Sequence, residues 1–189
     1  MFPGVRLDFL DLHKDTILHY FEGSVVTNNF NMRPHLEEAV RRVLPADMPV
    51  VYATVDSGGV YEARRLAQGA GVGFAHIEKR RLSGSETEVL GVAGDNVDRS
   101  CVVIFDDMIA TGGSVVNAVN AYRARGARAV YVAAVHGVFA GEALTVLKTL
   151  PGLDGVFVTD THPNAVQAAE SCPWITIVPV LDKFTRNWI

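Results

Sequence analysis

From residue 48 onward, short runs rich in β-branched and aromatic residues alternate with helical segments, and this alternation constrains the fold more than any other feature. Such runs are typical of buried strands. They span residues 48–55, 73–79, 101–107, 128–135, 154–160 and 174–180. The segments between them, such as VYEARRLAQGA and GSVVNAVNAYRARGA, repeat apolar residues at helical spacing. The alternation predicts an α/β fold, with a doubly wound, mainly parallel sheet flanked by helices.

The length of 189 residues favours a single domain with one full core. We divide it into a lead-in over residues 1–47 and an α/β core over residues 48–189. The lead-in predicts two helices, within 13–23 and 33–45, joined by the polar segment SVVTNNFNM. Ser, Gly and charged residues interrupt the alternation after 79, so we expect 80–88 to be a mobile loop without ligand, followed by a short strand or hairpin.

Composition excludes several classes of function. Hydrophobic residues make up 49% and charged residues 20% of the chain, as in ordinary globular proteins. The net charge of −4 offers no basic surface to nucleic acid or an anionic membrane, and no apolar segment approaches the roughly 20 residues that span a bilayer. Cys101 and Cys172 suggest neither a disulfide framework nor a zinc site. We therefore expect a cytoplasmic protein with no nucleic-acid or membrane partner.

Two adjacent acids, Asp106 and Asp107, end the strand over 101–107 and precede a tight turn. The turn consists of Ala110, Thr111, Gly112, Gly113 and Ser114. Ligands of parallel α/β sheets bind beyond the carboxyl ends of the strands, and a glycine turn at a helix start offers free N–H groups to a phosphate. Acids beside such a turn suit a ligand with a phosphate and vicinal hydroxyls, such as ribose 5-phosphate. The alternative is that Asp107 only caps the helix and the glycines only close the turn.

The stretch VVIFDDMIATGGS resembles the ribose-phosphate-binding signature of the type I phosphoribosyltransferase fold. Its surroundings resemble one branch of that fold, the ribose-phosphate pyrophosphokinases, which make phosphoribosyl pyrophosphate (PRPP). Further stretches match this branch in order: TVDSGGVYEARRLA, AHIEKRR with EVLGVAGD, VHGVFAGEAL, and DGVFVTDTHP. The resemblance covers nearly the whole chain. It corresponds to the second of the family's two similar halves, and residues 1–47 resemble the crossover before that half.

The resemblance implies a role for each group of residues. Asp106 would bind the ribose hydroxyls, and residues 110–114 would hold the 5-phosphate of ribose 5-phosphate or PRPP. Lys79 and Arg81 would lie on a loop that closes over the transferring phosphates of ATP and supplies positive charge. Asp56 matches an acid near a magnesium ion. The alternative interpretations are a solvated basic surface around Lys79 and a helix cap at Asp56.

The histidines add little to this interpretation. His136 and His162 lie at strand ends but lack metal-ligand spacing, so we expect structural roles for both. Those in the lead-in give no functional signal. In the family, the first half supplies much of the ATP site and a histidine that helps to hold magnesium, and that half is not among these residues.

Three functional hypotheses remain open. The first is PRPP synthesis from ribose 5-phosphate and ATP, together with an N-terminal half or partner. The second is a phosphoribosyltransferase that uses PRPP as donor, which Ala110 favours because many pyrophosphokinases have an acid there. The third is a non-catalytic regulatory subunit of a PRPP synthetase. We also expect at least a homodimer, because apolar side chains near the chain ends need cover: Phe2, Phe9, Phe184 and Trp188.

Overall fold

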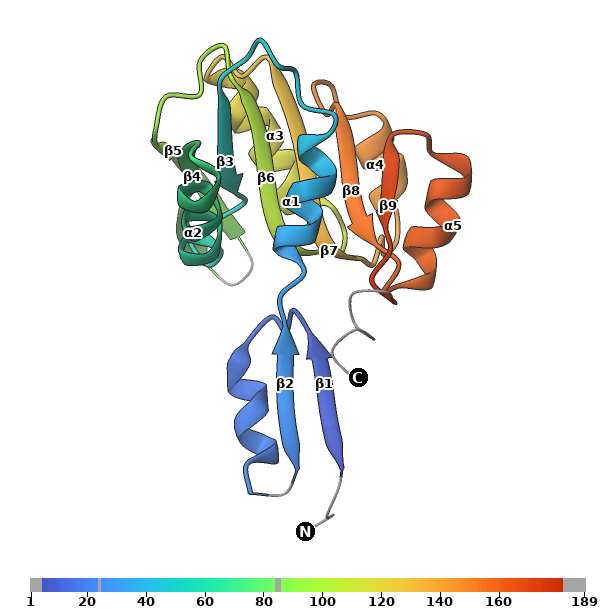
Figure 1. The fold of residues 1–189 in the computed structure, drawn as a ribbon. Coiled ribbons are helices and arrows are strands. Elements are labelled where there is room, and N and C mark those ends of the chain that lie inside the picture. The colour runs from blue at the N-terminus through green and yellow to red at the C-terminus, as the bar shows by residue number, and fades with distance from the viewer. Residues whose placement is uncertain (1–4, 24, 84–85, 182–189) are drawn as a thin grey trace.

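The core of the protein is a seven-stranded sheet with the strand order β5-β4-β3-β6-β7-β8-β9 (Figure 1). The computed structural model describes residues 5–23, 25–83 and 86–181, with the backbone alone for 79–83 and 86–89. All neighbouring strands are parallel except β4 and β5, which form an antiparallel hairpin at one edge. The strands are β3 Val50–Thr54, β4 Gly73–Ser83, β5 Glu86–Gly94, β6 Cys101–Ile109, β7 Ala129–Gly137, β8 Gly155–Thr159 and β9 Ile175–Val178.

Helices cover both faces of this sheet (Figure 1). On one face lie α1 Arg33–Arg41 and α2 Val60–Ala70, and on the other α3 Gly113–Ala124, α4 Ala143–Lys148 and α5 Pro163–Ser171. Successive residues of β6 alternate between the two cores: Val102 and Ile104 pack with α3, whereas Val103 and Phe105 pack with α1. Burial on both faces explains why the inner strands are continuous apolar runs. The prediction of a doubly wound, mainly parallel α/β fold is confirmed.

The direction of winding reverses between β3 and β6. The chain leaves β3 through α2 to reach β4 on one side, and β6 then pairs with the other side of β3, from Val50↔Cys101 to Thr54↔Phe105. Open α/β sheets form a ligand crevice at such a switch point, beyond the carboxyl ends of the strands. Asp56 follows β3 and Asp106 lies near the end of β6, so this topology brings both acids to the crevice.

The lead-in differs from the predicted pair of helices. β1 Arg6–Leu10 and β2 Val26–Phe30 form a separate two-stranded parallel sheet, joined by the 3-10 helix η1 Asp15–Phe21, and α1 follows β2. The small sheet projects from one end of the main body (Figure 1). The two predicted helices correspond to η1, which is a 3-10 helix within 13–23, and to α1. The prediction of a purely helical lead-in is wrong because it missed β1 and β2, and β2 lies within the segment taken as a plain connection. A single domain over residues 1–189 remains our proposal.

The segment after 79 is a hairpin over its described backbone. β4 continues to Ser83, β5 begins at Glu86, and the register pairs Lys79 with Val89 and Arg81 with Thr87. The expected loop is thus mostly strand. Residues 84–85 and the side chains of 79–89 lie outside the described residues, so the expected mobility of 80–88 stays a prediction.

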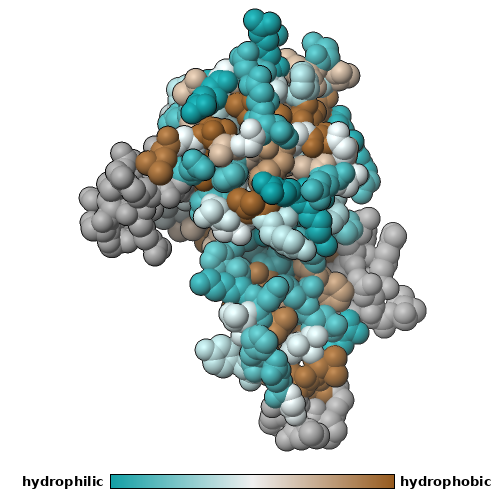
Figure 2. Space-filling model, turned by 90° about the vertical axis from the view of Figure 1, so that its left-hand side faces the viewer, coloured by the Kyte–Doolittle hydropathy of each residue, from teal (hydrophilic) through white to brown (hydrophobic). Residues whose placement is uncertain are grey.

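The side of the molecule on which α2 lies is mostly hydrophilic, with scattered hydrophobic side chains (Figure 2). Phe9 is half-buried, with its ring centroid 5.6 Å from that of Phe21, so it gives no support for a dimer. Phe2, Phe184 and Trp188 lie outside the described residues, and the homodimer stays a prediction. Among the helices that the structure describes, none is long and apolar enough to cross a membrane.

Tyr122 ties α3 to the strand end that leads to the crevice. Its side chain is fully buried, and its hydroxyl donates a hydrogen bond of 2.9 Å to the carbonyl of Thr54, the last residue of β3. We expect Tyr122→Phe to lower the free energy of unfolding by about 1 kcal/mol, because it leaves a buried carbonyl without this donor. Denaturant unfolding measures the loss. Tyr61→Phe is the control, because Tyr61 is 75% exposed and its replacement should change stability by less than about 0.5 kcal/mol. Equal stability of both variants would contradict the expectation.

Candidate functional site

The turn between β6 and α3 presents backbone groups to a cavity of about 220 Å³, the β6–α3 cavity. Gly112 has a φ of +84°, in the left-handed region that favours glycine. The first N–H groups of α3 lack partners within the helix and lie at the positive end of its dipole. The cavity lining includes all five predicted turn residues, together with acids and one histidine: Ala110, Thr111, Gly112, Gly113, Ser114, Asp56, Asp106, Asp107 and His13. The start of α3 therefore suits an anionic group, whereas the three acids suit hydroxyls or a cation.

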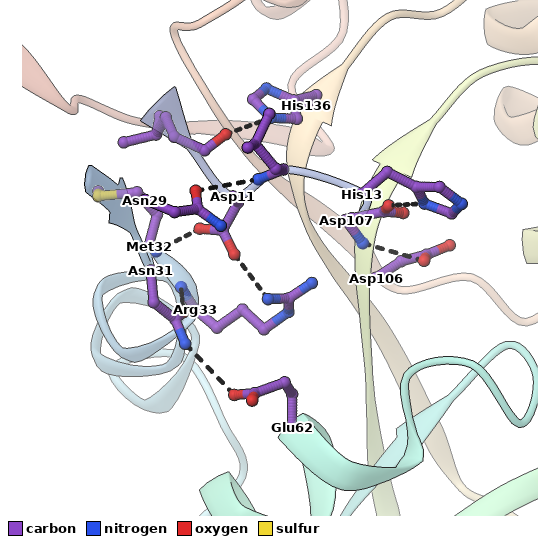
Figure 3. Close-up of polar contacts among 12 residues, drawn as sticks. Asp11, His13, Asn29, Asn31, Met32, Arg33, Glu62, Asp106, Asp107 and His136 are labelled. Carbon is purple, nitrogen blue, oxygen red and sulfur yellow. Dashed lines mark hydrogen bonds and ion pairs between the residues drawn. The ribbon is translucent and has the colours of Figure 1, made fainter. Parts of the chain in front are cut away.

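The carboxylates of Asp106 and Asp107 lie next to each other in the carboxyl-terminal half of β6, which continues to Ile109 (Figure 3). The Asp106 carboxylate accepts a hydrogen bond of 2.9 Å from the backbone N–H of Asp107. The Asp107 carboxylate accepts one of 2.8 Å from the backbone N–H of Met108. The other carboxylate oxygen of Asp107 contacts Nδ1 of His13. Since these are the contacts of Asp107 and the N-cap of α3 is Gly112, the interpretation of Asp107 as a helix cap is wrong.

The two acids differ in how readily they ionise. Burial, followed by the charge of the neighbouring Asp107, raises the pKa of Asp106 to about 8. Burial also opposes ionisation of Asp107, but the contact with His13 and the hydrogen bond with Asp106 outweigh it, and the pKa of Asp107 is lowered. The pair therefore holds one negative charge and one proton near neutral pH, and a cation or hydroxyl donor would favour loss of that proton.

This asymmetry predicts a pH-dependent stability. In the unfolded chain Asp106 ionises near 3.8, whereas in the folded chain it keeps its proton to about pH 8. Between these values the folded state binds more protons, so the free energy of unfolding should fall as the pH rises. We expect Asp106→Asn to remove this dependence and to stabilise the protein by about 1–3 kcal/mol more at pH 8 than at pH 5. Urea unfolding in metal-free buffer measures it, and an equal effect at both pH values would contradict it.

Asp56 reaches the same crevice from the end of β3. One of its carboxylate oxygens accepts a hydrogen bond of 2.9 Å from the N–H of Gly58, within the turn that precedes α2. The N-cap of α2 is Gly59, so Asp56 shapes the turn and does not occupy the cap position of the helix. Asp56 lines the β6–α3 cavity and a neighbouring one of about 260 Å³, which we name the lead-in cavity.

His13 is a site residue that the sequence interpretation missed. It follows β1 in the lead-in, contacts Asp107 and lines both cavities (Figure 3). The resemblance implied a site histidine only in the absent half, yet a histidine of this chain reaches the acids. The sequence carried no signal for it, because the strand that leads to His13 ends at Leu10 and was not predicted.

Positive charge reaches the site from the lead-in. Lys14 and Arg33 line the lead-in cavity together with Asp56, Asp106 and Asp107. Lys79 and Arg81 lie on β4, the strand that pairs with β3, but their side chains are outside the described residues. The geometry therefore brings together the predicted acids and turn, and leaves the two predicted loop cations untested.

The donor set fits a magnesium ion that is shared with a ligand. Magnesium takes oxygen ligands, keeps several waters and is commonly held by one or two carboxylates plus substrate phosphates. Asp56, Asp106 and Asp107 supply carboxylate oxygens around the β6–α3 cavity. Over the part of the chain that the structure describes, no group of three or more His, Cys, Asp or Glu side chains is arranged to hold a metal. A complete protein cage of the structural type is thus absent from these residues.

Comparisons with known proteins agree with this geometry. The model of the phosphoribosyl synthetase-associated domain family matches residues 78–181. The ribose-phosphate pyrophosphokinase of Chromobacterium violaceum is 35% identical over 175 residues, which cover 93% of this chain and 51% of that protein. The corresponding protein of Vibrio parahaemolyticus is 40% identical over 157 residues, covering 82% and 48%.

A solved structure gives the same result for the fold. The phosphoribosylpyrophosphate synthetase from Mycobacterium smegmatis superimposes with a TM-score of 0.80 at 29% identity, covering 96% of this chain and 57% of that one. The chain spans about half the length of the curated relatives it matches. It belongs to the phosphoribosyl synthetase-associated domain family, and its relatives are ribose-phosphate pyrophosphokinases.

Proposed function

We propose that this chain binds ribose 5-phosphate and PRPP, with magnesium, as the sugar-phosphate site of a ribose-phosphate pyrophosphokinase. In that reaction the 1-hydroxyl of ribose 5-phosphate attacks the β-phosphorus of ATP, the pyrophosphoryl group passes to the sugar, and AMP leaves. One observation carries the proposal: the two acids of β6 and the turn before α3 line one cavity at the switch point of the sheet.

Each part of the cavity suits one part of this ligand. The N–H groups at the start of α3 and the hydroxyls of Thr111 and Ser114 match a phosphate monoester. The carboxylates of Asp106 and Asp107 match the ribose hydroxyls, because a charged acceptor binds a hydroxyl more strongly than a neutral one. Ala110 leaves the turn without a further carboxylate, so the two acids of β6 would carry the hydroxyl contacts.

The polyphosphate of ATP would lie on the side of the cavity nearest Asp56 and the lead-in. Magnesium supplies charge neutralisation and orientation of the phosphates, and Asp56 with water and ligand oxygens would hold it there. Lys79 and Arg81, on the β4–β5 hairpin, are our candidates for the positive charge that stabilises the transferring group. Lys14 and Arg33 line the adjoining lead-in cavity and add to the positive charge near the phosphates.

The small sheet of the lead-in supports the proposal that this chain works together with an N-terminal half. Among the described residues, β1 and β2 pair only with each other, so their outer edges offer backbone N–H and C=O groups to further strands. A two-stranded sheet alone is marginally stable. We infer that an N-terminal half of the pyrophosphokinase type completes this sheet and supplies the adenine site. The homodimer and a cytoplasmic location also remain proposals, drawn from the apolar chain ends and the composition.

Calorimetry tests the proposal. The chain should bind ribose 5-phosphate and PRPP in the presence of magnesium, whereas unphosphorylated ribose should bind far more weakly because it lacks the group that the α3 turn accepts. ATP alone should bind weakly, and PRPP formation should be slight until a separately produced N-terminal half of a relative is added. No affinity for either sugar phosphate would contradict the proposal. Consumption of PRPP with a purine base would favour a phosphoribosyltransferase instead.

A further inference from the structure

The bend between β1 and η1 is held residue by residue by different parts of the fold (Figure 3). Its four residues, Leu10 to His13, have partners on β7, β2 and β6. These contacts are Leu10 O with His136 Nε2 (3.1 Å), Asp11 N with Phe30 O (2.9 Å), Leu12 N with Asn29 Oδ1 (3.1 Å), and His13 Nδ1 with Asp107. Together these contacts fix the direction of the bend.

Asp11 is the centre of these restraints. It is only 4% exposed, and its φ of +44° lies in the left-handed region that residues other than glycine rarely adopt. One carboxylate oxygen accepts a hydrogen bond from the backbone N–H of Met32, the N-cap residue of α1, and the other accepts one of 2.6 Å from Arg33. A strained backbone persists only where the surroundings over-determine it. Both carboxylate oxygens of Asp11 thus fix the path of the chain as it leaves β1.

The side chain of His13 cannot hold its own position by packing, because it is 64% exposed. Its place beside Asp107 therefore depends on the position of the backbone in the bend. That backbone is fixed two residues earlier by Asp11, and His136 attaches the preceding carbonyl to β7. The Nδ1 of His136 is bonded in turn to the hydroxyl of Thr161 at 2.8 Å, which restrains the ring.

We propose that Asp11 is a positioning residue: by locking the bend after β1 onto the start of α1, it sets His13 against Asp107 in the ligand site. The proposal rests on the proposed function in one respect, which is that the pair of His13 and Asp107 acts on a ligand. Asp11 itself acts through His13. If Asp11 only stabilised the lead-in, its loss would lower the stability of the protein but leave the contact of His13 with Asp107 intact in the folded molecules.

Side-chain ¹⁵N NMR of His13 in the ligand-free chain separates these two roles. The response of the His13 ring nitrogens to Asp107→Asn is measured in the natural background and in the Asp11→Asn background, with the folded fraction checked by denaturant unfolding. We expect a clear response in the natural background and less than about half of it when Asp11 is replaced, as for two coupled sites. An equal response in both backgrounds would overturn the proposal.

Asp8→Asn is the matched control. Asp8 is also on β1 and accepts hydrogen bonds from Arg6 and Asn28, outside the bend. Its replacement should leave the His13 response unchanged, and a loss as large as that of Asp11→Asn would mean general loosening of the lead-in and would overturn the proposal.

A second variant keeps the test decisive if Asp11→Asn does not fold. Asn29→Ala removes the acceptor for Leu12 and should reduce the His13 response in the same direction by a smaller amount, whereas an unchanged response would contradict the proposal. These measurements need no ligand, so they are independent of the calorimetry. A His13 response that depends on Asp11 in a chain that binds no sugar phosphate would support the positioning role and reject the proposed function.

Discussion

Gly94→Ala is expected to lower the free energy of unfolding by about 3 kcal/mol or more, from backbone strain and overpacking together. Gly94 is the last residue of β5, and its φ of +106° is accessible to glycine but strained for other residues. An added Cβ would lie 2.4 Å from the carbonyl oxygen of Phe74 and 2.9 Å from the Cα of Ala75. Both are backbone atoms of the paired strand β4, so no side-chain rotation relieves the clash.

The matched control is Gly69→Ala in α2. A Cβ at Gly69 would meet no atom within 4 Å, and replacing a glycine inside a helix by alanine should stabilise the protein by about 0.5–1 kcal/mol. Denaturant unfolding of the two variants should give opposite signs. A loss of less than about 1 kcal/mol in Gly94→Ala would mean that β5 moves away from β4 at little cost. In that case the hairpin that carries Lys79 and Arg81 would be only loosely joined to the sheet.

The main sheet could be predicted because its pattern is local. Each inner strand is buried on both faces, so β3 and β6 are continuous apolar runs, and each intervening helix has its own apolar spacing. The carboxyl ends of parallel strands all lie on the same side of the sheet, at the ends of the strands. That rule places Asp106 and the turn over 110–114 in one cavity as soon as the sheet is known.

The lead-in could not be predicted in the same way, because its strands exist through pairing. β2 contains the polar sequence TNN, and its partner β1 lies 20 positions earlier in register, with Arg6 opposite Val26. Neither strand has a fully buried residue, so the hydrophobic pattern is weak. The position of His13 depends on this pairing and on the bend at Asp11, and no local pattern reveals either of them.

Replacing both acids, as Asp106→Asn with Asp107→Asn, is expected to weaken ribose 5-phosphate binding in the presence of magnesium by about 3 kcal/mol or more, which is over about 100-fold in affinity. Each change removes a charged acceptor for the ribose hydroxyls and for metal-bound water. Calorimetry measures the loss. Asp98→Asn is the control, because Asp98 is exposed and lies before the amino-terminal end of β6, away from the cavity at the carboxyl ends of the strands. Unchanged affinity in the double variant would show that the two acids do not contact ribose 5-phosphate.

The pH dependence of binding gives this prediction a second, sharper test. In the ligand-free chain Asp106 keeps its proton near neutral pH, because burial and the neighbouring Asp107 raise its pKa to about 8. In the complex, a bound cation and the ribose hydroxyls favour the ionised form instead. Ligand binding must then release that proton, so affinity should rise between pH 7 and 8 by up to about tenfold per unit. The second ionisation of the sugar phosphate, near pH 6, is complete in this range and adds little. Asp106→Asn alone should bind more weakly than the natural protein and lose this slope. If Asp106→Asn kept the slope, the proton would come from another group, and Asp106 would not be the acid that meets the sugar.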